Sequence, residues 1–138
     1  MPRSGNRALL DTNVLLRFLR RDDAVQSPRA FSLMRRLESG AEEADLEDGV
    51  LAETVWVLEK GFKAPRTDIA AHLSQVVLCS GLKCRGKRLL LDALTRYAAT
   101  RCDIVDCLLA ARASSRNSKV YTFDRDFKNL GCRWEEPS

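Results

Sequence analysis

The first apolar segment of the chain is interrupted once, where a strand pattern gives way to a helix pattern. Residues 8–10 are apolar in succession, which is typical of a short strand buried on both faces. After the small polar residues Asp11, Thr12 and Asn13, apolar residues recur at helical spacing over residues 14–19. The pattern therefore predicts a strand, a tight turn and a helix, with Asp11 at the carboxyl end of the strand.

Short apolar strands and longer periodic helices continue to alternate along the rest of the chain. Ser27 is expected to cap the second helix, Gly40 to end it, and Asp103 to cap the last long helix. Helices are predicted at residues 28–39, 49–60, 65–80, 88–101 and 103–113, and strands just before residue 49 and at 82–85, 119–123 and 132–134. This order predicts an α/β fold with three layers, α/β/α, around a central, mainly parallel sheet.

Composition bounds the size and class of the protein. The chain has 138 residues, of which 45% are hydrophobic and 30% charged, values typical of one globular domain over residues 1–138. No apolar run approaches the roughly 20 residues that a membrane-spanning helix needs. The amino terminus has no signal-peptide pattern, so the expected location is the cytoplasm.

Cysteine and histidine usage narrows the chemistry. The five cysteines are odd in number and include no Cys-x-x-Cys pair, so reduced thiols are expected rather than a disulfide framework or a zinc ribbon. His72, the one histidine, lies within an ordinary helix pattern and is expected to be structural. Reactions that need a histidine base or a histidine-rich metal site are therefore excluded.

Four acidic residues occupy comparable places in the predicted elements. Asp11 and Asp124 each follow a strand, and Glu53 and Asp106 are expected in the first turns of helices entered from the same side. Each has a structural explanation as well, because Asp commonly caps helices and a carboxylate is stabilised near a helix amino terminus. If all strands run parallel, however, their carboxyl ends share one edge and the four carboxylates converge there.

Converging carboxylates predict a metal-dependent reaction. Ionised carboxylates a few ångströms apart repel one another unless a cation lies between them. Oxygen ligands without His or Cys favour Mg²⁺ or Mn²⁺, which can orient a phosphodiester and stabilise its attacking and leaving oxygens. The predicted substrate class is therefore a nucleic acid.

The segments that hold these acids also carry a family resemblance over almost the whole chain. They read LLDTN at residues 9–13, LAETVWVL at 51–58, DIVDCLLAA at 103–111 and TFDRDF at 122–127. In this order and at these intervals they resemble the motifs of PIN-domain nucleases, most closely the VapC toxin subunits of type II toxin–antitoxin pairs. Cys107 stands where family members often have alanine, a change without consequence for the chemistry.

The resemblance implies a Mg²⁺- or Mn²⁺-dependent endoribonuclease that acts as a homodimer and is silenced by a small antitoxin. The metal-binding, catalytic residues would be Asp11, Glu53, Asp106 and Asp124, with Thr12, Asn13 and Thr122 supporting them and the roles of Asp103 and Asp126 left open. The dimer contact is expected on the apolar faces of the first helices. A PIN nuclease of RNA processing, or a PIN-like module that binds RNA without cutting it, would show the same motifs.

Basic residues are the candidates for RNA binding. The net charge is +4, and the positive residues cluster rather than spread evenly. Those expected to guide RNA toward the acids are Lys87, Arg88, Arg112 and Arg116. The alternative is that they only cover solvent-exposed helix faces, as Lys and Arg commonly do.

Two other phosphoryl-transfer folds also place an Asp after the first strand. Haloacid-dehalogenase folds need a second acid two residues later, where this chain has Asn13. Receiver domains need paired acids before the first strand's Asp and a Lys at the end of a late strand, and this sequence has neither.

Overall fold

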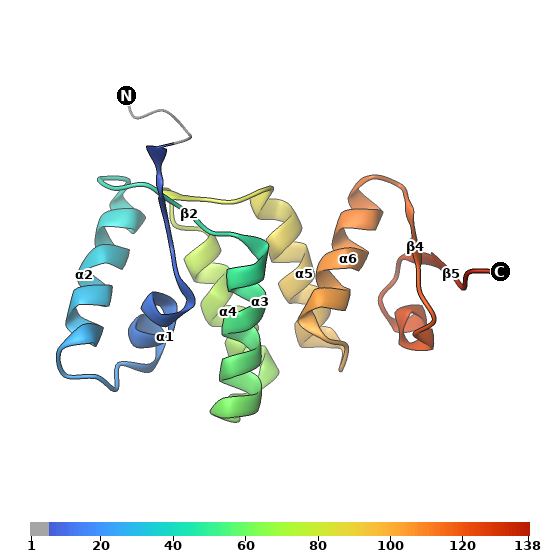
Figure 1. Ribbon diagram of the computed structural model, residues 1–138, viewed down its shortest axis with the longest axis horizontal. Coiled ribbons are helices and arrows are strands. Elements are labelled where there is room, and N and C mark those ends of the chain that lie inside the picture. Colours follow the sequence, from blue (N-terminus) through green and yellow to red (C-terminus); the bar gives the residue numbers. More distant parts are fainter. Residues whose placement is uncertain (1–5) are drawn as a thin grey trace.

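Short parallel strands alternate with longer helices in the computed structural model, which describes residues 6–138 (Figure 1). The α/β fold class predicted from the sequence is confirmed. In chain order the elements are β1 (Ala8–Leu9), α1 (Thr12–Arg20), α2 (Gln26–Ser39), β2 (Ala44–Asp45), α3 (Asp48–Trp56), the π-helical turn η2 (Val57–Gly61), α4 (Arg66–Val77), β3 (Leu82–Lys83), α5 (Lys87–Ala99), α6 (Ile104–Ser115), β4 (Lys119–Tyr121), the 3₁₀ turn η3 (Arg125–Asn129) and β5 (Arg133–Glu135).

Every strand pairing is parallel, but the strands form two hydrogen-bonded sets. One set has the order β1-β2-β3, in which Leu9 lies opposite Asp45 and Asp45 opposite Lys83. The other set joins β4 to β5, with Val120 opposite Trp134. The strands therefore do not make the single sheet on which convergence of the four acids was expected.

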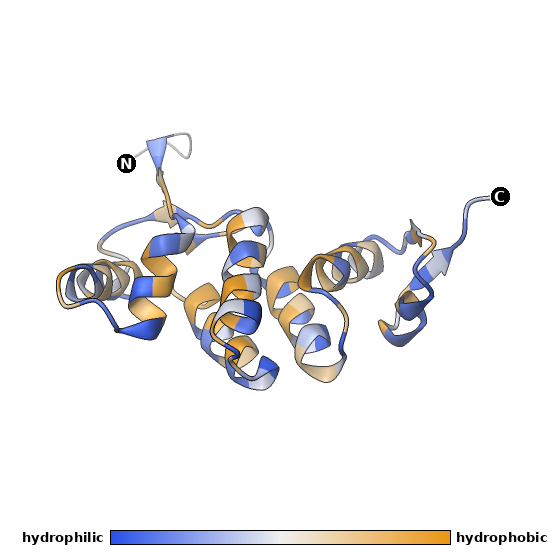
Figure 2. Cartoon of the chain, turned by 60° about the horizontal axis from the view of Figure 1, so that its bottom comes forward, coloured by the Kyte–Doolittle hydropathy of each residue, from blue (hydrophilic) through white to orange (hydrophobic). Residues whose placement is uncertain are grey.

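The turn after α6 directs β4 away from the first sheet. The backbone N–H of Ser118 donates to the carbonyl of Ala113 at 2.8 Å, and Asn117 has a left-handed φ of 53°. Asn adopts this conformation more readily than most residues. In Figures 1 and 2, β1 lies toward one end of the molecule and the β4–β5 pair at the other, beyond α6.

The helix ends follow local chemistry with one exception. Gly40 ends α2 with φ 82°, as predicted. The start of α2 differs from the prediction, because the Asp23 carboxylate accepts hydrogen bonds from the backbone N–H groups of Val25 and Gln26. Ser27 lies inside the helix instead of capping it, and its hydroxyl donates to the carbonyl of Arg17 at 2.7 Å.

The hydrophobic core lies between the helices. The fully buried side chains include Leu15, Leu51, Leu73, Leu94 and Tyr97, one or two from each of α1, α3, α4 and α5. Figure 2 shows the apolar stripes of the neighbouring helices turned toward one another. Amphipathic helices pack in this way because burial removes their apolar stripes from water.

One arginine connects η2, α4, α5 and the turn before α6. The guanidinium of Arg66 donates to the carbonyl oxygens of Tyr97 at 2.9 Å and Cys102 at 2.5 Å, and to the Glu59 carboxylate at 3.0 Å. The Tyr97 hydroxyl donates to the same carboxylate. Arg66 therefore holds the chain just before Asp103, where α6 begins.

The five cysteines are all free, as predicted. Cys102 and Cys107 are buried, and burial together with the neighbouring Cys102 raises the pKa of the Cys107 thiol to about 12. A thiol with that pKa is almost entirely protonated at neutral pH and is a poor nucleophile. Separately, none of the helices between residues 6 and 138 has both the length and the apolar character that crossing a bilayer requires.

Gly81 should tolerate no side chain. A Cβ there would lie 2.1 Å from the carbonyl oxygen of Glu42 and 2.7 Å from that of Leu37, whereas a Cβ at Gly49 meets nothing within 4 Å. Gly81→Ala should lower the free energy of unfolding by about 3 kcal/mol, because backbone atoms must shift. The matched Gly49→Ala should leave it unchanged or raise it by up to about 1 kcal/mol. Urea unfolding measures both, and equal effects would contradict the packing described.

The Glu59 carboxylate should stabilise the fold in a pH-dependent way. Burial by itself would raise its pKa, but the Tyr97 hydrogen bond and the Arg66 charge outweigh burial and lower it below 4.5. The stabilisation is therefore present above that pH and is lost as pH falls through the lowered pKa. Glu59→Gln should lower the free energy of unfolding by about 2 kcal/mol near pH 7. The loss should shrink at about pH 3, and Glu38→Gln, at an exposed position on α2, is the control.

Candidate active site

Asp106 is the centre of the negative charge in the described structure. It is the third residue of α6 and partly buried, in the first turn as predicted. Burial raises the pKa of its carboxyl group, and three neighbouring negative charges raise it further. With those neighbours Asp106 forms a group that we call the acidic cluster: Asp103, Asp106, Asp124 and Asp126.

Asp103 has a structural role within the acidic cluster. As predicted, it caps α6, where its Oδ2 accepts from the backbone N–H of Val105 at 3.1 Å. Its Oδ1 accepts from Nε1 of Trp56 at 2.6 Å. Both carboxylate oxygens therefore already hold the start of α6 in place, on the helix itself and against α3.

Asp124 lies in a tight turn after β4. Its backbone N–H donates to Oγ1 of Thr122 at 2.9 Å, and its Oδ1 accepts from the backbone N–H of Asp126 at 2.9 Å. Thr122 therefore supports Asp124, in keeping with its expected role. Asp124 and Asp126 are both exposed, so they are accessible to a ligand from solvent.

Glu53 lies farther along its helix than the sequence suggested. Because α3 begins at Asp48, Glu53 is its sixth residue, beyond the first turn in which backbone N–H groups are free. The expectation that Glu53 belongs to a first turn is therefore wrong. A helix-dipole explanation for this exposed carboxylate is lost with it.

The contact between α3 and α6 puts Glu53 level with Asp106. Asp48 at the start of α3 pairs with Arg112 late in α6 at 2.6 Å, and Trp56 at the end of α3 pairs with Asp103 at the start of α6. The two helices are therefore antiparallel, as Figure 1 shows, and are not entered from the same side as expected. Glu53, near the end of α3, reaches the level of the first turn of α6.

Asp11 is exposed at the carboxyl end of β1, in the first sheet. It occupies the position before α1, but its side chain makes no capping hydrogen bond. The structural explanation of Asp11 as a helix cap is therefore not realised. Thr12 beside it is buried, and Asn13 is exposed.

The structure brings some of the predicted site residues together and not others. Asp106 and Asp124 share the acidic cluster, whereas Asp11 and Glu53 lie outside it. Within residues 6–138 no three His, Cys, Asp or Glu side chains lie close enough to hold one metal ion. The four-acid site remains a prediction.

The predicted RNA-binding residues divide into two kinds. Arg112 is half-buried in its ion pair with Asp48, and the Lys87 ammonium group donates to the carbonyl of Cys79 at 2.6 Å. Arg88 and Arg116 are exposed. Exposed cations are the ones that can meet a phosphate without first breaking an internal contact.

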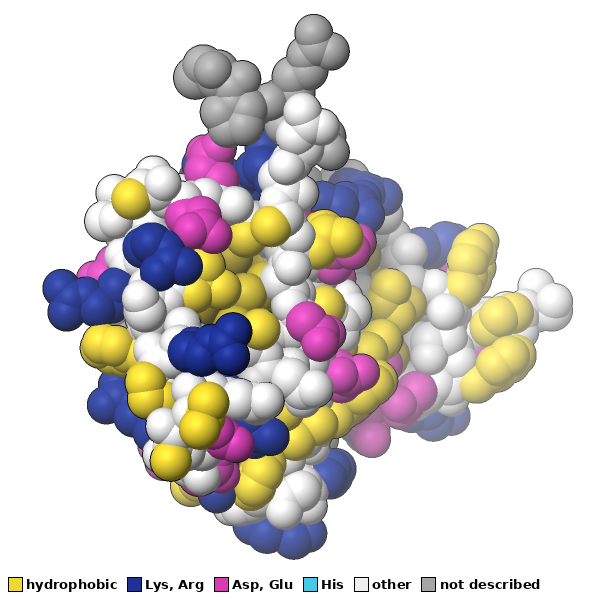
Figure 3. Space-filling model, turned by 60° about the vertical axis from the view of Figure 1, so that its left-hand side comes forward, with side chains coloured by type: hydrophobic (Ala, Val, Ile, Leu, Met, Phe, Trp, Pro, Cys, Tyr) yellow, Lys and Arg dark blue, Asp and Glu magenta, His cyan; other side chains and the backbone are white. Residues whose placement is uncertain are grey.

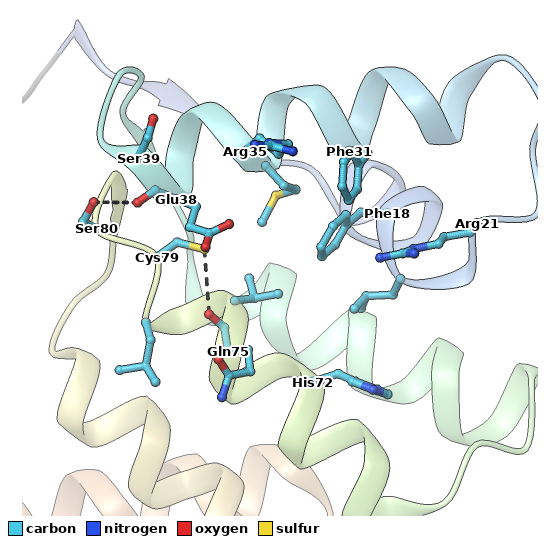
Figure 4. Close-up of a pocket in the computed structure, with 14 residues that line it drawn as sticks. Phe18, Arg21, Phe31, Arg35, Glu38, Ser39, His72, Gln75, Cys79 and Ser80 are labelled. Atoms are coloured by element: carbon cyan, nitrogen blue, oxygen red, sulfur yellow. Dashed lines mark hydrogen bonds between the residues drawn. The ribbon is translucent and has the colours of Figure 1, made fainter.

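The largest groove lies away from the acids. It has a volume of about 990 Å³ and lies between α1, α2 and α4, with Phe18, Phe31 and Met34 among its apolar lining and Arg21 and His72 at its rim (Figure 4). Figure 3 views this side of the molecule, where hydrophobic side chains are exposed between Lys and Arg side chains. None of the predicted catalytic residues lines the groove.

Trp56 and Asp48 are the residues that sequence reasoning missed. Both fix α6 through contacts with residues 47 and 64 positions away along the chain. The only signal in the sequence was a large aromatic residue three positions after Glu53, on a helix whose buried stripe was already complete without it.

Comparison with known proteins agrees with the motif resemblance. The model of the PIN domain family matches residues 8–131 of the chain. The chain is similar to a VapC ribonuclease of Aquifex aeolicus (strain VF5), with 30% identity over 131 residues. The matched region covers 94% of this chain and 96% of that protein.

Variants of the acidic cluster should separate capping from charge repulsion. Asp103→Asn keeps a side-chain acceptor and should change stability little, whereas Asp103→Ala should lower the free energy of unfolding by about 1 kcal/mol. Trp56→Phe should cost about the same, since it removes the donor to Asp103. Thermal unfolding of the three variants tests this ranking, and an Asp103→Ala protein as stable as Asp103→Asn would contradict the capping role.

Asp106→Asn should instead stabilise the fold near neutral pH. A raised pKa means that the ionised carboxylate is disfavoured in the folded state, so stability falls as pH rises through that pKa. Removing the charge should raise the free energy of unfolding by about 0.5 kcal/mol near pH 7 and change little at about pH 3. Unfolding in urea with EDTA present measures the difference. Destabilisation at neutral pH would show that the Asp106 charge is not repelled.

Proposed function

The chain belongs to the PIN domain family, and on this premise we propose that it is a metal-dependent endoribonuclease, the toxin of a toxin–antitoxin pair. The observation that carries the proposal is the acidic cluster. Asp106 is held beside three other carboxylates although that arrangement raises its pKa and costs stability. Residues that work against stability in this way are most often kept for chemistry.

The donor set fits a hard divalent cation. The cluster consists of carboxylates alone, and the repulsion at Asp106 is what a bound cation would relieve. We propose Asp11, Glu53, Asp106 and Asp124 as the residues that would hold Mg²⁺ or Mn²⁺. The bound ion would supply positive charge to stabilise the phosphodiester as it is hydrolysed.

Asp103 and Asp126 have different parts in this proposal. Both oxygens of Asp103 accept hydrogen bonds from Trp56 and Val105, so Asp103 acts as a positioning residue for the start of α6. Asp126 is exposed, and its backbone N–H orients Asp124. Its carboxylate would add negative charge beside the ion.

The exposed cations would bring the RNA to the acids. Arg88 and Arg116 are accessible, so we propose that they contact phosphates and that binding weakens as salt rises. Arg112 and Lys87 would contribute to the field while keeping their internal partners. Which RNA is bound would depend on its shape and exposed single-stranded loops rather than on a simple base code.

Partners follow from the proposed toxin role. We expect a small antitoxin protein that silences the nuclease, a homodimer as the active assembly, and action in the cytoplasm, where the RNA is found. A PIN nuclease of RNA processing would cleave RNA without an antitoxin. A non-catalytic module would bind RNA in a salt-dependent way and leave it intact.

The purified protein should cleave structured RNA when Mg²⁺ or Mn²⁺ is present and not in EDTA. Because water rather than the RNA 2′-hydroxyl would attack the phosphorus, the products should carry 5′-phosphate and 3′-hydroxyl ends. Asp106→Asn should lower the cleavage rate at least about 100-fold, by loss of a metal ligand. End analysis and gel-based rates measure both effects.

Matched variants keep that experiment specific. Asp103→Asn should retain most of the activity, because Asn also caps the helix. Asp68→Asn removes the same charge from an exposed position on α4 and should be neutral. Cyclic phosphate ends, or cleavage that persists in EDTA, would rule out the proposed mechanism.

A further inference from the structure

Two strand edges have no partner within residues 6–138. β1 is hydrogen-bonded to β2 on one side only, and β4 to β5 on one side only. Such edges present free backbone N–H and C=O groups that can pair with another strand. Parallel strands in particular are normally buried on both faces and between neighbours.

Large apolar side chains are exposed at both edges. Leu9 in β1 is 67% exposed, while Tyr121 in β4 and Phe123 just after it are 64% and 73% exposed. Exposed apolar side chains on adjacent strand residues mark surfaces that gain stability when covered. The two edges therefore lack the same thing, a neighbouring parallel strand with apolar side chains.

The two edges complement each other in direction and chemistry. Both strands belong to parallel pairs, and each is followed within three residues by a predicted metal ligand, Asp11 after β1 and Asp124 after β4. If β4 were added in parallel to β1, the carboxyl ends of the two strands would meet. Asp11 would then come to the edge at which the acidic cluster already holds Asp124 and Asp106.

The β4 that reaches β1 belongs to another copy of the chain in this conformation. Figures 1 and 2 show β1 and the β4–β5 pair at opposite ends of the molecule, with α6 between them. The turn at Asn117 that separates them is closed by backbone hydrogen bonds to Ala113 and Ser114. A short turn of this kind is a common hinge for exchange of identical segments between copies.

We propose that two copies of this chain form a two-fold dimer by segment exchange, in which β4 of each copy pairs in parallel with the free edge of β1 in the other. The arrangement is reciprocal, so both free edges of both copies are covered and no edge is left to extend into a filament. Each active site would then take Asp11 from one copy and Asp106 and Asp124 from the other. This inference rests on the proposed function only for the role of the acids, and the pairing itself stands on the strands.

A cross-linking experiment tests the pairing without relying on activity. The full-length double variant Leu9→Cys/Tyr121→Cys is treated with a short thiol-specific cross-linker and run on a denaturing gel, with the unmodified chain as control for its own cysteines. Segment exchange predicts covalent dimers well above the control, and light scattering of the untreated protein should give twice the mass of one chain. A cross-linked monomer, or no cross-link beyond the control, would overturn the proposal.

Complementation tests the shared site. Asp11→Asn and Asp124→Asn are each expected to be inactive, and they are co-expressed so that mixed dimers form. One of the two sites in a mixed dimer keeps both acids, so random pairing should restore about one quarter of the wild-type rate. If each site lies within one copy, mixing restores nothing, which would overturn the shared site. A wild-type protein that dimerises and cross-links but does not cleave RNA would count against the proposed function alone.

Discussion

Parallel strand pairing is the constraint on which the rest of this structure depends. A strand of two or three residues contributes few hydrogen bonds, so β1, β2 and β3 are stable only because helices connect and cover them. The same pairing decides which carboxylates share an edge, since Asp11 and Asp124 each follow the end of a strand. The position of β4 relative to β1 is therefore a question of stability and of site assembly at once.

The antiparallel contact of α3 with α6 provides the second organising feature. Trp56 and Asp48 each take one polar group on α6 as a partner, near opposite ends of the contact. Because the two ends are fixed, the residues between them are held at matching levels, which places Glu53 level with Asp106. Arg66 supports the same region from behind, through the carbonyl of Cys102 just before α6.

Stability and the proposed chemistry act in opposite directions in the acidic cluster. The helix cap, the Trp56 hydrogen bond and the Arg66 contacts stabilise the start of α6, while the charges around Asp106 destabilise it. Asp103 contributes to both, since its charge repels Asp106 while its oxygens hold the helix. A site built in this way keeps its carboxylates close in the absence of a cation because neighbouring groups hold the backbone in place.

Local features were predictable from the sequence because they depend on neighbouring residues. Gly40 ends a helix through its own backbone freedom, Asp103 caps the helix that follows it directly, and the apolar periodicity located every helix and strand to within a few residues. The position of Glu53 in its helix, the partner of Arg112 and the role of Trp56 were decided only by tertiary structure. These depend on contacts between residues 47 or 64 positions apart, and no local pattern specifies such contacts. The division of the strands into two sets has the same cause, because a strand's sequence indicates that it needs a neighbour but not which strand supplies it.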